Sequence, residues 1–262
     1  MNQLIIYLND SLNFIKDFSS LSCSVFYQVF KRPFYYRLII QNMYDFSYRS
    51  LFIVISFAIS VGMVVTLHIG YSLEKYGAKI YVSKVMILSL LSEIGTVLIV
   101  FILAGKIGAG ITSEIASMKI SEQLDALRAL GVSPIKRVII PKVLACFFII
   151  PILCVLVSAI GLLTSAYVGK VYLQLDFVNF LARALLTPPL EFFLFGVFKT
   201  FVFSFFIAIT SCHYGLNIGK GSYEVGQSTM RAFVVSFMLI IFGDLVLTSI
   251  YYNFIHFGGL SH

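Results

Sequence analysis

The sequence predicts an all-α membrane protein that crosses the bilayer several times, and three observations lead to this fold class. First, 59% of the 262 residues are hydrophobic and only 12% are charged. A soluble domain carries about 25% charged residues, so this chain lacks the side chains that would cover a water-exposed surface. Second, the apolar residues lie in long continuous runs. Third, the alternating pattern of a membrane β-barrel is missing. A soluble enzyme, a disordered chain and a disulfide-linked scaffold are therefore excluded.

Five apolar runs are long enough to cross a bilayer, which takes roughly 20 residues in a helix. The predicted spans are residues 50–73, 85–106, 143–169, 192–213 and 232–256. Residues 1–49 precede them as a cytoplasmic and interfacial segment, and residues 50–256 form one membrane domain. Near the N-terminus, Leu4, Leu8 and Leu12 recur at helical spacing opposite polar residues. This pattern predicts an amphipathic helix in the membrane interface.

The charge distribution predicts the orientation of the chain. The net charge is +7, from 19 Lys and Arg residues against 12 Asp and Glu residues. In a membrane protein this excess marks cytoplasmic loops and does not indicate nucleic-acid binding. With a cytoplasmic N-terminus, twelve basic residues face the cytoplasm, five face the opposite side, and two lie within spans. We therefore expect the N-terminus in the cytoplasm.

The loop between the second and third spans has two distinct parts. Gly105, Gly108 and Ala109 are small, which predicts close packing against another helix. The second part, residues 114–130, is amphipathic and predicts one surface helix that ends at Gly131, shortly before Pro134. Its charged face carries Glu122, Asp125 and Arg128, and its apolar face carries Ile115, Met118, Leu124, Leu127 and Leu130.

This loop closely resembles the signature of the MlaE/YrbE permease family, the membrane subunits of ABC lipid transporters. The matching residues are Glu93, Gly95, Ala104-Gly105, Gly108, Glu114, Met118, Glu122-Gln123-Leu124-Asp125-Ala126-Leu127, Gly131 and Pro134. A second block is similar to the family's C-terminal region through Gly219-Lys220-Gly221, Gly226, Thr229, Arg231-Ala232 and Asp244. The chain departs from the family pattern at three positions. Ser92 and Lys106 stand where the pattern has Arg, and Thr96 stands where it has Pro.

The resemblance implies a homodimeric permease bound by a cytoplasmic ABC ATPase subunit and working with an MCE-domain lipid-binding protein. Its cargo would be phospholipid or a related membrane lipid. The surface helix would be the coupling helix that contacts the ATPase, through Glu122, Gln123, Asp125, Ala126, Leu127 and Arg128. The chain itself has no GxxxxGK[ST] motif, so we expect a transport subunit that is not an enzyme. ATP and Mg would bind the partner ATPase, and no cofactor is expected on this chain.

Four ionisable residues fall within or beside the predicted spans: Glu93, Lys106, Lys199 and Asp244. A charge in the bilayer is costly, so such residues face the bundle interior or a cavity. We take them as candidates for a polar translocation path. The competing interpretation is structural pairing, with Lys106 or Lys199 as the partner of Glu93.

No catalytic or metal-binding pattern is visible. The four His residues have no HExxH spacing, the four Cys residues have no CxxC spacing, and GxSxG is missing. An alternative function is a membrane scaffold, or an intramembrane enzyme of unknown chemistry that acts without an ATPase; its only motivation is the pair of acids within the spans. Abundant Phe and Tyr without Trp are typical of an AT-rich genome. The expected location is therefore a plastid (chloroplast) inner envelope membrane or a bacterial inner membrane.

Overall fold

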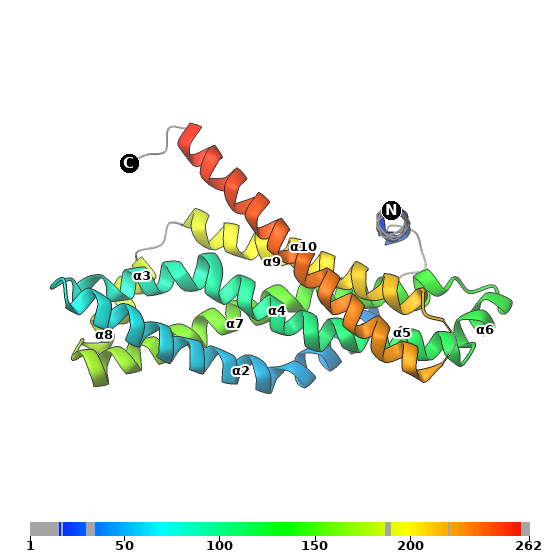
Figure 1. The fold of residues 1–262 in the computed structure, drawn as a ribbon, viewed down its shortest axis with the longest axis horizontal. Helices are drawn as coiled ribbons and strands as arrows, with labels where there is room; N and C mark the ends of the chain where they lie inside the picture. The colour runs from blue at the N-terminus through cyan, green and yellow to red at the C-terminus, as the bar shows by residue number, and fades with distance from the viewer. Residues whose placement is uncertain (1–15, 17, 30–34, 187–189, 220, 258–262) are drawn as a thin grey trace, which may run out of the picture. The chain divides into compact units, whose positions relative to one another are not determined.

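The chain is mostly helical in the part that the structure, a computed structural model, describes: residues 16, 18–29, 35–186, 190–219 and 221–257 (Figure 1). No β-strand occurs within these ranges. Residues 18–29 form a helix, whereas most of the predicted N-terminal amphipathic pattern, Leu4 to Leu12, lies outside the described residues. The following elements are α2 (Tyr36–Glu74), η1 (Lys79–Tyr81), α3 (Val82–Ser89), η2 (Leu90–Leu98), α4 (Ile99–Leu103), η3 (Ala104–Gly108), α5 (Ala109–Ile120), α6 (Gln123–Ala129), η4 (Ile135–Ile139), α7 (Ile140–Leu173), α8 (Phe177–Leu186), α9 (Leu190–Leu216) and α10 (Ser222–Phe257).

Five helical stretches of the described chain are long and apolar enough to cross a membrane. They are Tyr36–Glu74, Lys79–Ile120, Ile135–Leu173, Glu191–Leu216 and Ser222–Asn253. Each overlaps one predicted span and continues beyond at least one of its ends, because adding residues to an existing helix is easy once the helix is nucleated. The predicted all-α fold with five membrane-spanning helices is confirmed.

The chain divides into two compact units, which we describe separately. Unit 1 comprises residues 1–46, 104–147 and 205–239, and unit 2 comprises residues 47–103, 148–204 and 240–262. Unit 1 thus contains α5, α6 and η4, and unit 2 contains α3, η2 and α8.

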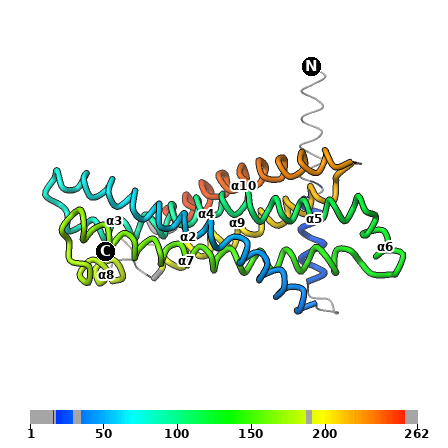
Figure 2. Tube along the Cα trace, turned by 90° about the horizontal axis from the view of Figure 1, so that it is seen from below, coloured from blue at the N-terminus to red at the C-terminus, as the bar shows by residue number. Residues whose placement is uncertain are grey.

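Unit 2 is built on a close crossing of α2 and α7. A Cβ atom on Gly62 would lie 2.6 Å from the carbonyl oxygen of Gly161, so the two backbones touch. The hydroxyl of Ser165 donates to the Gly161 carbonyl at 2.7 Å. The short helix α8 lies beside the end of α7 (Figures 1 and 2). It adds Phe180 and Ala184 to an apolar core that also contains Val82, Ile87, Leu91, Leu162, Ala166 and Leu173.

Unit 1 is built on a close contact of η3 and α5 with α9. A Cβ atom on Gly108 would lie 2.9 Å from the Ser211 hydroxyl, and one on Gly215 would lie 2.9 Å from Cβ of Ile115. These glycines allow the two helix backbones to approach more closely than larger residues would.

The single helix predicted over residues 114–130 is wrong, because the structure has two helices there. Helix α5 ends at Ile120 and α6 begins at Gln123. The Ser121 hydroxyl bonds back to the Ser117 carbonyl at 2.8 Å, and Glu122 adopts the left-handed conformation with φ of 58°. The turn redirects the chain so that Leu124 is buried. The predicted apolar face is therefore split, and Leu130 at its end is exposed.

Candidate functional site

Three of the predicted intramembrane residues form one cluster in unit 2. Lys199 is fully buried, and its Nζ lies 3.1 Å from Oε1 of Glu93 and 2.7 Å from Oδ1 of Asp244. The ammonium also donates to the Ser92 carbonyl at 3.3 Å. The two acids are less covered, since the Glu93 side chain is 46% exposed and the Asp244 side chain 19% exposed. We call these three residues the charged cluster, and its open side is at Glu93.

Local backbone features bring the charged cluster together. Glu93 lies on η2, a π-helical segment, and such segments occur often at functional sites because they re-aim side chains. Helix α9 approaches this segment closely at Gly196, where a Cβ atom would lie 2.5 Å from the Leu91 carbonyl oxygen. Lys199 follows Gly196 by one helical turn, so the close approach carries its ammonium toward Glu93.

Aromatic rings lie beside the charged cluster. The Lys199 ammonium is 5.2 Å from the centre of the Phe195 ring, a distance at which the ring attracts a cation. Phe195 in turn stacks on Tyr251 of α10, with ring centres 3.9 Å apart. The charged cluster and an aromatic pair therefore lie together within apolar helices.

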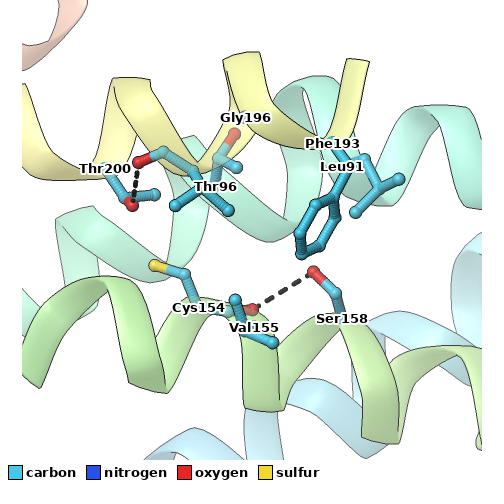
Figure 3. Close-up of a pocket in the computed structure, with 9 residues that line it drawn as sticks. Leu91, Thr96, Cys154, Val155, Ser158, Phe193, Gly196 and Thr200 are labelled. Atoms are coloured by element: carbon cyan, nitrogen blue, oxygen red, sulfur yellow. Dashed lines mark hydrogen bonds between the residues drawn. The ribbon is translucent and has the colours of Figure 1, made fainter. Parts of the chain in front are cut away.

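A small cavity lies near this part of unit 2 (Figure 3). Its volume is about 10 Å³, which is close to the space of one water molecule. The hydroxyls of Thr96, Ser158 and Thr200 in its wall donate to carbonyls of their own helices, those of Ser92, Cys154 and Val197. The cavity is too small for a lipid chain and its three hydroxyls are already bonded, so it carries no argument for a cargo site.

The second candidate region is the tip formed by α6 in unit 1 (Figure 2). Five of the six predicted contact residues are exposed, namely Glu122, Gln123, Asp125, Ala126 and Arg128, and Leu127 is partly exposed. Asp125 and Arg128 form an ion pair at 2.8 Å. Because both side chains are more than 60% exposed, this pair contributes at most about 1 kcal/mol to stability, and its charges are open to another partner.

The end of α6 is fixed by its backbone. Gly131 has φ of 71°, the left-handed conformation that favours glycine. The Val132 amide donates to the Leu127 carbonyl and the Gly131 amide to the Arg128 carbonyl, both at 2.9 Å. These two bonds form a Schellman motif, which matches the predicted helix end at Gly131.

The remaining predicted residues lie elsewhere in unit 1. Lys106 is exposed on η3 and is not part of the charged cluster. A Cβ atom added at Gly105 would lie 3.5 Å from the Phe233 ring of α10, which is an ordinary contact distance. Gly108, in contrast, lies tightly against α9. Ala109 is partly buried beside it. Within the described residues no group of three or more His, Cys, Asp or Glu side chains is arranged to hold a metal ion.

Sequence reasoning missed two features of these regions. It did not identify Gly196, although a glycine one turn before a lysine inside a span is a recognisable signal. It also included Lys142 only among the twelve basic residues expected to face the cytoplasm, whereas the structure buries it against Glu114. The burial of Lys142 has no local signal, because it depends on how separate helices pack.

The fold and the charged cluster define a multi-pass helical membrane protein with a polar interior, and comparison with known proteins gives its family. Residues 39–250 match the family Permease MlaE, and the chain belongs to this family. It is similar to the probable ABC transporter permease protein RP096 of Rickettsia prowazekii, with 34% identity over 90% of this chain and 91% of that protein. It is therefore an ABC transporter permease subunit.

Two further relatives come from other groups of organisms. The probable ABC transporter permease protein slr1045 of Synechocystis is 33% identical over 72% of each chain. The probable ABC transporter permease protein ycf63 of Pyropia yezoensis is 31% identical over 80% of each chain.

Proposed function

We propose that this permease subunit moves phospholipid or a related lipid across or out of its membrane, driven by a separate ATPase. The observation that carries the proposal is the charged cluster inside apolar helices. A lipid has a charged or zwitterionic headgroup and apolar chains, so its path needs polar groups at membrane depth within an otherwise apolar wall. The open carboxylate of Glu93 and the buried ammonium of Lys199 supply such groups.

The ATPase acts on α6 in this proposal. The exposed Asp125 and Arg128 of α6 form only a weak ion pair with each other. Each can therefore pair instead with an opposite charge on a cytoplasmic partner. ATP and Mg bind that partner, and this chain contributes no cofactor. Two copies of the chain form a homodimer, an MCE-domain lipid-binding protein receives or delivers the lipid, and the N-terminus is cytoplasmic. The membrane is a bacterial inner membrane or a plastid inner envelope membrane.

Copurification tests the proposal. The chain purified in mild detergent is expected to retain an ATPase subunit and bound phospholipid, detected by mass spectrometry. Reversing two charges of α6, with Glu122→Lys and Asp125→Lys, is expected to remove the ATPase while leaving the helical content unchanged. If the doubly reversed variant recovers the ATPase and hydrolyses ATP with lipid at wild-type levels, the proposed role of α6 is contradicted.

The alternative of a scaffold or an intramembrane enzyme makes a different prediction. It requires activity of the isolated chain without nucleotide, with Glu93 and Asp244 as its acids. Proteoliposomes that contain the chain alone separate the two functions, because the transport proposal predicts no lipid movement until the ATPase and ATP are added.

A further inference from the structure

The structure contains a second interhelical ion pair, in unit 1. Lys142 lies on α7 with only 4% of its side chain exposed, and its Nζ is 2.6 Å from Oε2 of Glu114 on α5. It also donates to the side-chain oxygen of Asn42 on α2 at 3.4 Å. The amide nitrogen of Asn42 bonds to the Leu38 carbonyl at 2.7 Å, which turns its oxygen toward the lysine. A lysine this deeply buried is retained only when its charge is paired.

The ion pair joins two segments that lie on either side of α6 in the chain. Glu114 lies in α5, before the α6 tip, and Lys142 lies in the first turn of α7, after the tip and η4. Figure 2 shows the chain passing along α5, through α6 and back into α7. The ion pair therefore joins the two arms of the α5–α6–η4 loop at its base.

The arm formed by α5 is also held on its opposite face. The Thr112 hydroxyl donates to the Ser211 carbonyl at 3.1 Å, and the Lys119 ammonium donates to the Leu216 carbonyl at 2.5 Å. Both carbonyls belong to α9. Helix α5 is thus bonded to α9 on one side and to α7 on the other, so the pair links the returning arm to an already braced helix.

We infer that the Glu114–Lys142 pair is a clasp that makes the two arms of the α6 loop move as one body. A force applied at α6 then shifts α5 and the start of α7 together. Without the clasp the two arms bend independently, and part of the displacement is lost within the loop. Glu114 and Lys142 are positioning residues in this account, which rests on the proposed contact between α6 and the ATPase.

The test compares variants in proteoliposomes that contain the permease and its ATPase. Lys142→Met replaces the buried cation with an apolar side chain of similar length, Lys142→Arg keeps the cation, and Lys170→Met changes an exposed lysine of the same helix. The clasp predicts that Lys142→Met recovers the ATPase normally but moves about tenfold less lipid per ATP hydrolysed. Lys142→Arg is expected to restore most of this ratio, and Lys170→Met to match the wild type.

The outcomes separate the clasp from the proposed function. A wild-type complex that couples ATP to lipid movement, together with an unchanged ratio in Lys142→Met, overturns the clasp alone. Loss of ATPase recovery in Lys142→Met also overturns it, because the residue then serves assembly. A wild-type chain that binds no ATPase contradicts the proposed function itself. Should Lys142→Met fail to fold, Glu114→Gln combined with Lys142→Met removes both charges and is judged by the same ratio.

A measurement with the ion pair intact gives an independent answer. Nitroxide labels on Ser113→Cys and Arg137→Cys, with the exposed Cys23 changed to Ser, report the separation of the two arms. The clasp predicts the same label distance in the nucleotide-free and nucleotide-bound complex. A distance that changes between these two states overturns it.

Discussion

At the scale of single residues, the charged cluster is a buried set of ion pairs that also lies on the proposed lipid path. Two carboxylates face one ammonium inside apolar helices, and the ammonium has no exposed surface. Removing one partner of such a pair leaves an uncompensated charge, whereas removing all partners together leaves none. This difference allows a structural role to be separated from a role on the lipid path.

Lys199→Met is expected to destabilise the chain by about 3 kcal/mol, the lower end of the cost of breaking a buried pair, because Asp244 loses its counter-charge while Glu93 is half exposed. The combination Glu93→Gln, Lys199→Met and Asp244→Asn is expected to recover most of that loss, since no net charge stays buried. Thermal unfolding in detergent measures both. If the lipid path includes the cluster, the recovered triple variant still moves little lipid. A melting temperature of Lys199→Met equal to that of the wild type contradicts the ion pairing of Lys199 with the two acids.

At the scale of elements, the turn between α5 and α6 shows how backbone strain sets the position of charged residues. Glu122 is held in a left-handed conformation, which costs a residue with a side chain about 1–3 kcal/mol unless its surroundings impose it. The same residue is the N-cap of α6 and carries one of the exposed charges. Geometry and charge can therefore be tested separately at one position.

Glu122→Gly is expected to stabilise the turn slightly, because glycine adopts this conformation without strain. It should weaken ATPase binding only by the loss of one charge. Glu122→Lys keeps the strain and reverses the charge, so it should weaken binding more. Equilibrium binding of the ATPase to each purified variant measures the difference, and equal losses in the two variants would show that the charge of Glu122 is irrelevant.

The contact between α5 and α9 provides a second test at this scale. Gly215→Ala places a methyl group against Cβ of Ile115, which is attached to the backbone and cannot swing away. The expected cost is about 1–3 kcal/mol of stability. Gly110→Ala on α5, the helix that packs against α9, is the control, because an added Cβ atom there meets nothing within 4 Å. Chemical unfolding curves of the two variants should differ clearly; coincident curves contradict the close packing.

At the scale of the whole molecule, the sequence predicted the features that depend on local composition. Apolar runs of sufficient length defined the five spans, and Gly131 marked the end of α6. The ionisable residues within spans were identified because such residues are rare in lipid, and Lys199 was one of two lysines considered as the partner of Glu93.

The features that the sequence did not predict depend on helices that are distant in the chain. The choice of Lys199 over Lys106 follows from the close approach of α9 to η2 at Gly196. The break at Glu122 accompanies the burial of Leu124, and a periodic pattern alone cannot specify it. The ion pair of Lys142 with Glu114 likewise requires knowledge of how α5 and α7 pack.

The central claim is that a cytoplasmic ATPase drives this subunit through α6, and the most direct test is site-specific crosslinking at Gln123, which is exposed on this helix. A photoreactive residue at position 123 in the intact complex is expected to capture the ATPase subunit, with nucleotide changing the yield. Capture of no other subunit, or labelling of position 123 only by a reagent confined to the non-cytoplasmic side, would contradict the account.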